Sequence, residues 1–164
     1  MNNSDTVRID AAPTATEEVR SLVDELETLL SVEYPPGQRH GLALDAIFQP
    51  HIRFFLARLR GGAVGCGGVA LFSDFAEVKR MYVRDVAGGK GVADAILARI
   101  EEEVGDAGLS VLRLETGERQ VAAMRFYARA GFRRCQVFGA YTLMSPQSIA
   151  TSVFFEKRIG LPAA

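Results

Sequence analysis

The sequence contains no tryptophan, only two cysteines and only two histidines among its 164 residues. Cys66 and Cys135 lie far apart and match no metal-ligand spacing, while His40 and His51 are too few for a histidine-rich site. No metal centre is therefore predicted. Because the N-terminus has neither the basic start nor the apolar core of a signal peptide, we expect a cytoplasmic protein with two free thiols.

An excess of charge of one sign and long apolar runs are missing too. With 19 Lys and Arg against 20 Asp and Glu, the net charge is −1, which gives no electrostatic case for binding nucleic acid or a membrane surface. No apolar run reaches the length needed to cross a bilayer. The 48% hydrophobic and 24% charged composition is ordinary for a globular protein, and the length predicts one domain over residues 1–164.

Apolar periodicity predicts an α/β chain with a mixed sheet. Three consecutive strands should form an antiparallel meander, with Gly61-Gly62 as its first turn, and the strand–helix–strand segment that follows should be a parallel βαβ unit. The segment 139–151 is polar and irregular. The predicted helices cover 17–31 (capped by Thr16), 44–48, 91–108 and 120–130, and the predicted strands cover 7–9, 52–59, 63–72, 75–83, 110–115, 132–138 and 152–157.

A glycine cluster between the strand ending at Val83 and the next helix is the most informative local feature. Gly88, Gly89 and Gly91 would let an anion approach the backbone, and the first N–H groups of the helix lack internal partners. The loop is no Walker A motif, since no hydroxyl residue follows Lys90, and it lacks the Rossmann G-x-G-x-x-G spacing. It predicts either a phosphate site or a turn that only joins strand to helix.

The segments VKRMYVRDVAGGKGVADAIL and QVAAMRFYARAGF, with the order of the elements around them, resemble the GCN5-related N-acetyltransferase (GNAT) superfamily over about residues 7–158. The tail and the segment YPPGQRHGL resemble a narrower bacterial subgroup, some of whose members are labelled indole-acetic-acid acetyltransferase-like. The resemblance implies the GNAT fold, a mixed, mostly antiparallel central sheet flanked by helices, with a βαβ cofactor-binding core. Homodimers are common in this superfamily.

The resemblance implies acetyl-CoA as the cofactor. The family's loop [QR]-x-x-G-x-[GA] falls on residues 88–93, where Gly91 and Ala93 match but Gly88 replaces the usual Arg or Gln, so we expect weaker binding through backbone N–H groups. Arg84 is a further candidate for a phosphate contact. The implied cofactor-binding residues are Met81, Tyr82, Val83, Gly88, Gly89, Lys90, Gly91, Val92, Ala93, Gln120 and Tyr127.

The implied reaction is acetyl transfer from acetyl-CoA to a primary amine of a small molecule or peptide. Tyr127 is the candidate acid for the CoA thiolate, with an unperturbed phenol pKa near 10, although it could simply pack against Phe126. Glu77 is a candidate base. Glu115 is a second carboxylate that could act as a base or orient the substrate. Both could instead pair with neighbouring basic residues such as Lys79.

The acceptor site is expected beside the polar segment after the first helix. Tyr34, Arg39 and His40 lie there, and an arginine with a histidine would suit a substrate carboxylate; Tyr141 could close the other side. The alternative is a plain surface loop. Two rival functions stay open, a non-catalytic acyl-CoA-binding or sensing domain and a dimerisation module without a ligand.

Overall fold

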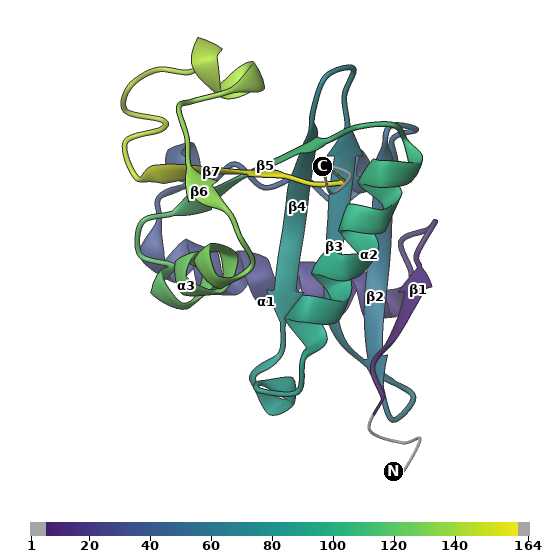
Figure 1. The fold of residues 1–164 in the computed structure, drawn as a ribbon. Helices are drawn as coiled ribbons and strands as arrows, with labels where there is room; N and C mark the ends of the chain where they lie inside the picture. Colours follow the sequence, from purple (N-terminus) through teal and green to yellow (C-terminus); the bar gives the residue numbers. More distant parts are fainter. Residues whose placement is uncertain (1–5, 161–164) are drawn as a thin grey trace.

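A computed structural model describes residues 6–160, so residues 1–5 and 161–164 of the predicted domain lie outside the described residues. Seven strands form one sheet in the order β1-β2-β3-β4-β5-β7-β6, and Figure 1 shows helices on both of its faces. All neighbouring strands are antiparallel except β4 and β5, which are parallel. The strands are β1 (Arg8–Ala11), β2 (Ile52–Leu59), β3 (Gly62–Leu71), β4 (Ala76–Val83), β5 (Val111–Gly117), β6 (Arg133–Arg134) and β7 (Ser152–Arg158).

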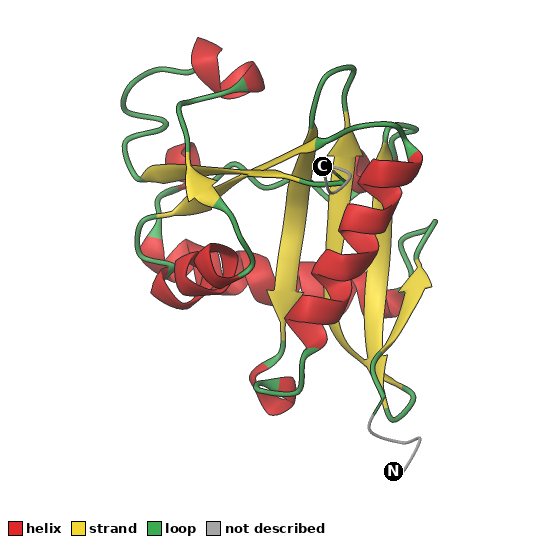
Figure 2. Cartoon of the chain, viewed as in Figure 1, coloured by secondary structure: helices red, strands yellow, loops and turns green. Residues whose placement is uncertain are grey.

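Three α-helices and four short 3₁₀ helices complete the described chain (Figure 2). Thr16 caps the first helix as predicted, because its hydroxyl accepts the N–H of Val19. The predicted helix at 44–48 is a single 3₁₀ turn. The α-helices are α1 (Glu17–Glu33), α2 (Val92–Asp106) and α3 (Val121–Arg129), and the 3₁₀ helices are η2 (Pro36–Gln38), η3 (Asp45–Phe48), η4 (Asp85–Ala87) and η5 (Gly139–Leu143).

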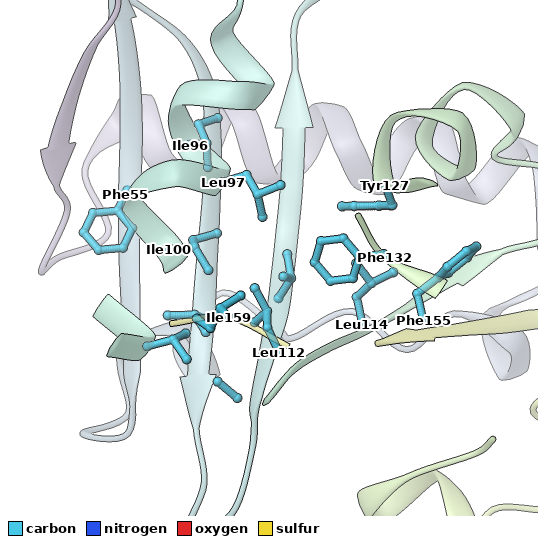
Figure 3. Close-up of a cluster of buried hydrophobic side chains, with 14 of the residues drawn as sticks. Phe55, Ile96, Leu97, Ile100, Leu112, Leu114, Tyr127, Phe132, Phe155 and Ile159 are labelled. Atoms are coloured by element: carbon cyan, nitrogen blue, oxygen red, sulfur yellow. The ribbon is translucent and has the colours of Figure 1, made fainter. Parts of the chain in front are cut away.

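The two long helices bury apolar stripes against opposite faces of the sheet. Val19 and Leu22 of α1 pack with one cluster, and Ile96 and Ile100 of α2 pack with a larger one. Figure 3 shows the larger cluster continuing sideways from α2 towards Tyr127. Each fully buried aliphatic side chain contributes about 1.5–3 kcal/mol, so these two layers hold the sheet between the helices.

The antiparallel meander β2–β3–β4 is confirmed, but its first turn is shifted by one residue. Arg60 and Gly61 occupy the turn with φ values of 54° and 82°, and Gly62 already belongs to β3. Two successive positive φ values match the right-handed twist of the flanking strands.

The predicted strand at 132–138 is wrong, because only Arg133–Arg134 pair with β7. The chain then leaves the sheet edge and buries Phe138 in a separate aromatic cluster with Phe75, Tyr141 and Phe154. The segment 139–151 is irregular as predicted, apart from the 3₁₀ helix η5. Burial of Phe138 thus decides where the strand ends.

The two parallel strands separate almost at once. β4 and β5 share only the pairs Ala76↔Leu112 and Glu77↔Arg113, after which Figure 1 shows them running apart. Beyond Glu77, the edge of β4 that faces β5 has no strand partner among the described residues. This split in the sheet positions the candidate site.

A β-bulge lies in β4 next to the split. Lys79 pairs with Gly68 and Tyr82 pairs with Cys66, so Arg80 and Met81 oppose one residue of β3. Arg80 has a φ of 54°, a left-handed conformation that costs about 1–3 kcal/mol in a residue other than glycine. Bulges redirect side chains, and this one reverses the alternation of β4 beside the split.

Candidate active site

A cavity of about 140 Å³ lies where β4 and β5 separate. It brings together both predicted catalytic residues and all five predicted acceptor residues. Three of the predicted cofactor contacts line it as well. The predicted residues in its lining are Glu77, Tyr127, Tyr34, Arg39, His40, Glu115, Tyr141, Met81 and Gln120.

A three-residue cluster of Lys79, Glu77 and Tyr141 forms one wall of the cavity. The Lys79 Nζ lies 2.8 Å from Glu77 Oε2, and the Tyr141 hydroxyl donates to the same oxygen at 2.7 Å. Lys79 Nζ also donates to the Tyr141 hydroxyl at 3.1 Å. Burial, reinforced by the neighbouring Glu77, raises the pKa of Tyr141, which keeps that hydroxyl protonated as a donor.

Glu77 uses one carboxylate oxygen for this cluster and keeps the other free. Both contacts fall on Oε2, so Oε1 has no hydrogen-bond partner among the described residues. The pairing with Lys79 is the alternative that the sequence left open. Since Glu77 is only 4% exposed, this ion pair is well shielded from water.

Glu115 lies at the other side of the split in a different environment. The Ser152 hydroxyl at the start of β7 donates to Glu115 Oε2 at 2.5 Å. Burial raises the pKa of Glu115, although this hydrogen bond and the charges of His40 and Lys79 oppose the shift. A carboxylate with a raised pKa binds a proton more readily, which suits a general base. No local sequence pattern marks Ser152, because only the pairing of β5 with β7 brings it there.

Tyr127 both packs in the core and lines the cavity. Its ring centroid lies 5.3 Å from that of Phe126 and 5.5 Å from that of Phe132. Figure 3 labels Tyr127 and Phe132 as neighbours in the apolar cluster. Its hydroxyl has no hydrogen-bond partner among the described residues. The expectation of an unperturbed phenol is wrong, because burial raises the pKa of Tyr127.

Arg80 is a lining residue that the sequence did not single out. Its Nε donates to the Leu42 carbonyl at 2.8 Å, and its Nη2 lies 2.5 Å from Glu27 Oε1. Glu27 Oε2 also binds Arg39 Nη1 at 3.2 Å, so one carboxylate joins two guanidinium groups. Gly41 packs on Arg80 so closely that a Cβ at Gly41 would overlap the guanidinium.

The arginine pair is not fully satisfied. Arg80 Nη1 and Arg39 Nε are buried without a hydrogen-bond partner among the described residues. Two positive groups share one negative partner, and the site therefore keeps a positive charge and two donors beside the cavity. Sequence alternation could not find Arg80, because the bulge changes which way its side chain faces.

His40 and Tyr34 are held by hydrogen bonds to distant segments. The His40 Nε2 lies 2.7 Å from the Ser148 carbonyl oxygen, and its ring meets Tyr141 edge-on at 5.7 Å. The Tyr34 hydroxyl accepts the N–H of Arg119 at 2.9 Å. The predicted acceptor segment is therefore an ordered wall of the cavity.

The glycine loop has the conformation of an anion cradle. Gly89 and Gly91 have φ values of 73° and 76°, and Gly91 directly precedes α2. The first helical bond joins Ala95 N–H to the Gly91 carbonyl, so the N–H groups of Val92 and Ala93 have no partner within the helix. No atom lies within 4 Å of a Cβ built at Gly89 or Gly91, which leaves open space for a phosphate group. The loop therefore fits the pyrophosphate of a nucleotide cofactor.

Gly88 and Lys90 lie in the same loop but differ in their surroundings. Gly88 follows η4 with a φ of −61°, a value that residues with side chains adopt readily. Lys90 is exposed. The loop itself does not line the cavity, so the predicted cofactor-binding and acceptor residues are spread from the N-terminus of α2 to the split.

Two residues after the bulge direct their side chains to α1. The Tyr82 hydroxyl donates to Glu25 Oε1 at 3.1 Å, and Arg84 Nη2 pairs with Glu25 Oε2 at 2.7 Å. Arg84 is thus an ion-pair partner of α1, and its contact with a phosphate stays a prediction. Val83, like Met81, is half-buried and lies on β4 beyond its pairing with β5.

Three further expectations concern metals, membranes and thiols. Within residues 6–160, no group of three or more His, Cys, Asp or Glu side chains could hold a metal ion. No helix in the described part of the chain is long and apolar enough to span a membrane. Cys66 and Cys135 are both free, as predicted.

The fold is thus an open mixed sheet, split between two parallel strands beside a helix that begins after a glycine loop. The sequence model of the Acetyltransferase (GNAT) family matches residues 20–132, which is more than half of the chain. The chain therefore belongs to the GNAT family of acetyltransferases, and the predicted fold is confirmed.

Two curated relatives are similar over most of their length. An "IAA acetyltransferase" of Azospirillum brasilense is 40% identical over 141 residues, which cover 85% of this chain and 89% of the relative. The "Uncharacterized N-acetyltransferase YsnE" of Bacillus subtilis (strain 168) is 33% identical over 127 residues, 76% of this chain and 84% of the relative.

Solved structures share the fold. A protein of Klebsiella pneumoniae, described provisionally as an acyl-CoA N-acyltransferase, superposes with a TM-score of 0.76 at 26% identity, over 95% of this chain and 99% of its own. N-acetylglutamate synthase from Neisseria gonorrhoeae, solved with coenzyme A and N-acetyl-glutamate, has a TM-score of 0.72 at 15% identity, over 94% of this chain and 36% of its own. This protein of the same fold thus binds coenzyme A.

Proposed function

We propose that this protein is an acetyl-CoA-dependent N-acetyltransferase that acts on a primary amine. The observation that carries the proposal is the cavity at the β4–β5 split, where two carboxylates and a tyrosine converge. Family membership supports the acetyl donor. The cavity supports a reaction that needs a base on one side and a proton donor on the other.

Acetyl-CoA would supply an activated acetyl group on a thioester. The loop from Gly88 to Ala93 would hold its pyrophosphate through backbone N–H groups, with Lys90 nearby in solvent. The unpaired edge of β4 at Met81, Tyr82 and Val83 would bind the extended arm of the cofactor, and Gln120 would donate its side-chain amide to the same arm. Main-chain N–H groups at this edge would also stabilise the negative charge that develops on the thioester oxygen.

Glu77 and Glu115 would have different roles towards the amine. Glu77 Oε1, which is free, would anchor the incoming ammonium group. Glu115 would accept the proton, since burial raises its pKa and so its affinity for that proton. The deprotonated nitrogen then attacks the thioester carbon, a C–N bond forms, and the C–S bond breaks.

Tyr127 acts on the departing sulfur. Burial keeps its phenol protonated, and its hydroxyl is not engaged by any described residue. It would donate a hydrogen bond to the thiolate as the C–S bond breaks. The nitrogen would lose its second proton as the amide forms, this proton would convert the thiolate to the CoA thiol, and Glu115 would release the first proton to solvent.

The arginine pair supports an acceptor with a carboxylate. Arg39 and Arg80 share the single carboxylate of Glu27, and each keeps a buried N–H donor free. A substrate carboxylate would satisfy these donors, and His40 would adjoin it. Tyr34 and Tyr141 would shape the walls around it.

Two measurements test the proposed function. Acetyl-CoA should raise the melting temperature of the protein, and the release of free thiol should follow when an amine of the acceptor class is added. Stabilisation by acetyl-CoA without thiol release on any amine would favour a non-catalytic acyl-CoA sensor instead. Gly88, which lacks the usual long polar side chain, is the feature that favours this second candidate.

A further inference from the structure

A second, larger cavity of about 470 Å³ adjoins the first. It lies between the segment 40–42, the start of β2, the β3–β4 turn and η5. The two cavities share part of their lining, including the whole Lys79–Glu77–Tyr141 cluster, which therefore forms the wall between them. The shared residues are His40, Gly41, Glu77, Lys79 and Tyr141.

The second cavity is lined mainly by rings and apolar side chains. The rings of Phe72 and Phe75 are tilted by 33° with centroids 4.9 Å apart, and the His51 ring centroid lies 5.6 Å from that of Phe72. Ile52 and Ala70 line the same cavity. Phe72 is 39% exposed, so this aromatic wall is reached from solvent. Such a surface binds a flat apolar group by burial and by ring–ring contacts.

Size separates the roles of the two cavities. The first holds the ionisable groups but has only about 140 Å³, while the second has about 470 Å³ and a wall of rings. A small amine needs only the first. The second cavity is separated from Glu77 Oε1, the carboxylate oxygen without a partner, only by the Lys79–Glu77–Tyr141 cluster. It therefore fits the remainder of a larger acceptor.

We propose that the second cavity binds an aryl group of the acceptor, joined to its primary amine by a short aliphatic link. The inference rests on the proposed function, because it takes the amine to be the group that is acetylated. The ring stacks beside Phe72 and Phe75, the link passes the Tyr141 phenol, and the ammonium reaches Glu77 Oε1. The acceptor class is thus an arylalkylamine or an amino acid with an aromatic side chain.

Calorimetric titration of 2-phenylethylamine into the protein saturated with CoA tests this site without turnover. Ring burial contributes enough free energy that 2-phenylethylamine should bind at least about tenfold more tightly than ethylamine. Ala140 is exposed and lines the second cavity but not the first, so Ala140→Leu and Ala140→Trp should weaken the binding of 2-phenylethylamine in a graded way. Ala107→Trp, at the exposed end of α2, is the matched control and should bind as the wild type does.

The outcomes separate this inference from the proposed function. Equal binding of 2-phenylethylamine and ethylamine, or wild-type affinity in both Ala140 variants, would overturn the aryl site even if acetyl-CoA releases thiol on other amines. A graded loss with unchanged stabilisation by acetyl-CoA supports it. Graded binding without thiol release would keep the aryl site and remove the transferase activity.

Discussion

The Tyr141 hydroxyl donates a hydrogen bond of 2.7 Å to Glu77, across 64 residues of sequence, and so ties η5 to the start of β4. Both side chains are almost fully buried, at 5% and 4% exposure. A buried carboxylate needs partners that compensate for the loss of water, and Lys79 supplies the second partner at Oε2. This contact holds together the Lys79–Glu77–Tyr141 cluster that lines both cavities.

Tyr141→Phe should lower the free energy of unfolding by about 1–3 kcal/mol, because it removes a donor from a buried carboxylate. Urea denaturation measures the change. Tyr127→Phe is the matched control, since the Tyr127 hydroxyl has no partner among the described residues and its loss should leave stability nearly unchanged. Equal stability of the two variants would contradict the role of the Tyr141 hydrogen bond.

Tyr127→Phe should lower kcat by about tenfold or more while the affinity for acetyl-CoA stays the same, because the leaving sulfur loses its donor. Steady-state thiol release and calorimetry measure the two quantities. Burial raises the pKa of Tyr127, so no loss of activity from its ionisation should appear up to pH 10. An unchanged kcat would remove Tyr127 from the mechanism.

Glu115→Gln should lower kcat by about a hundredfold, because the proton of the amine loses its acceptor. The same substitution that lowers kcat should stabilise the folded protein at neutral pH. A carboxyl with a raised pKa binds more protons when folded than when unfolded, so it destabilises the fold as pH rises above its unfolded pKa. Glu115→Gln should therefore raise the melting temperature at pH 7, and this gain should vanish at about pH 4. A lower melting temperature at pH 7 would mean that the ionised carboxylate is structural.

Gly91→Glu should abolish binding of acetyl-CoA, because it places a side chain and a negative charge at the start of α2. Gly91→Ala separates charge from strain. This substitution destabilises the fold by about 1–2 kcal/mol, because alanine must adopt a left-handed φ. No atom lies within 4 Å of the added Cβ. Calorimetry should find binding in Gly91→Ala and none in Gly91→Glu. Binding in both would mean that the phosphate lies elsewhere.

Gly88→Arg should tighten binding of acetyl-CoA by about three- to tenfold, since a guanidinium would add a charge-assisted contact to the pyrophosphate. The φ of −61° accepts a side chain, although its Cβ would approach the Asp85 carbonyl to 3.2 Å. Gly88→Ala brings a Cβ equally close to the Asp85 carbonyl but adds no charge, so it should bind acetyl-CoA as the wild type does. Equal affinity in Gly88→Arg and Gly88→Ala would show that this position does not face the cofactor.

Much of the site follows from the sequence because its residues belong to local patterns. The glycines before α2 and the tyrosine on α3 stand at fixed positions relative to their helices, and both lie where the patterns predict. Arg80 and Ser152 have no such marker. Arg80 enters the cavity wall because a bulge adds one residue to β4, and Ser152 reaches Glu115 through the register of β5 with β7.

The sequence alone determines the fold class, the order of the elements and the glycine loop, because apolar periodicity and positive φ requirements are local properties of the chain. It also limits the chemistry, by supplying few histidines and cysteines but several carboxylates and tyrosines. Only the tertiary structure decides which carboxylate is paired and which has a raised pKa, since both depend on burial and on partners distant in sequence. The end of the strand at Arg134, the second cavity and the arginine pair around Glu27 arise in the same way, from packing between segments that the sequence keeps far apart.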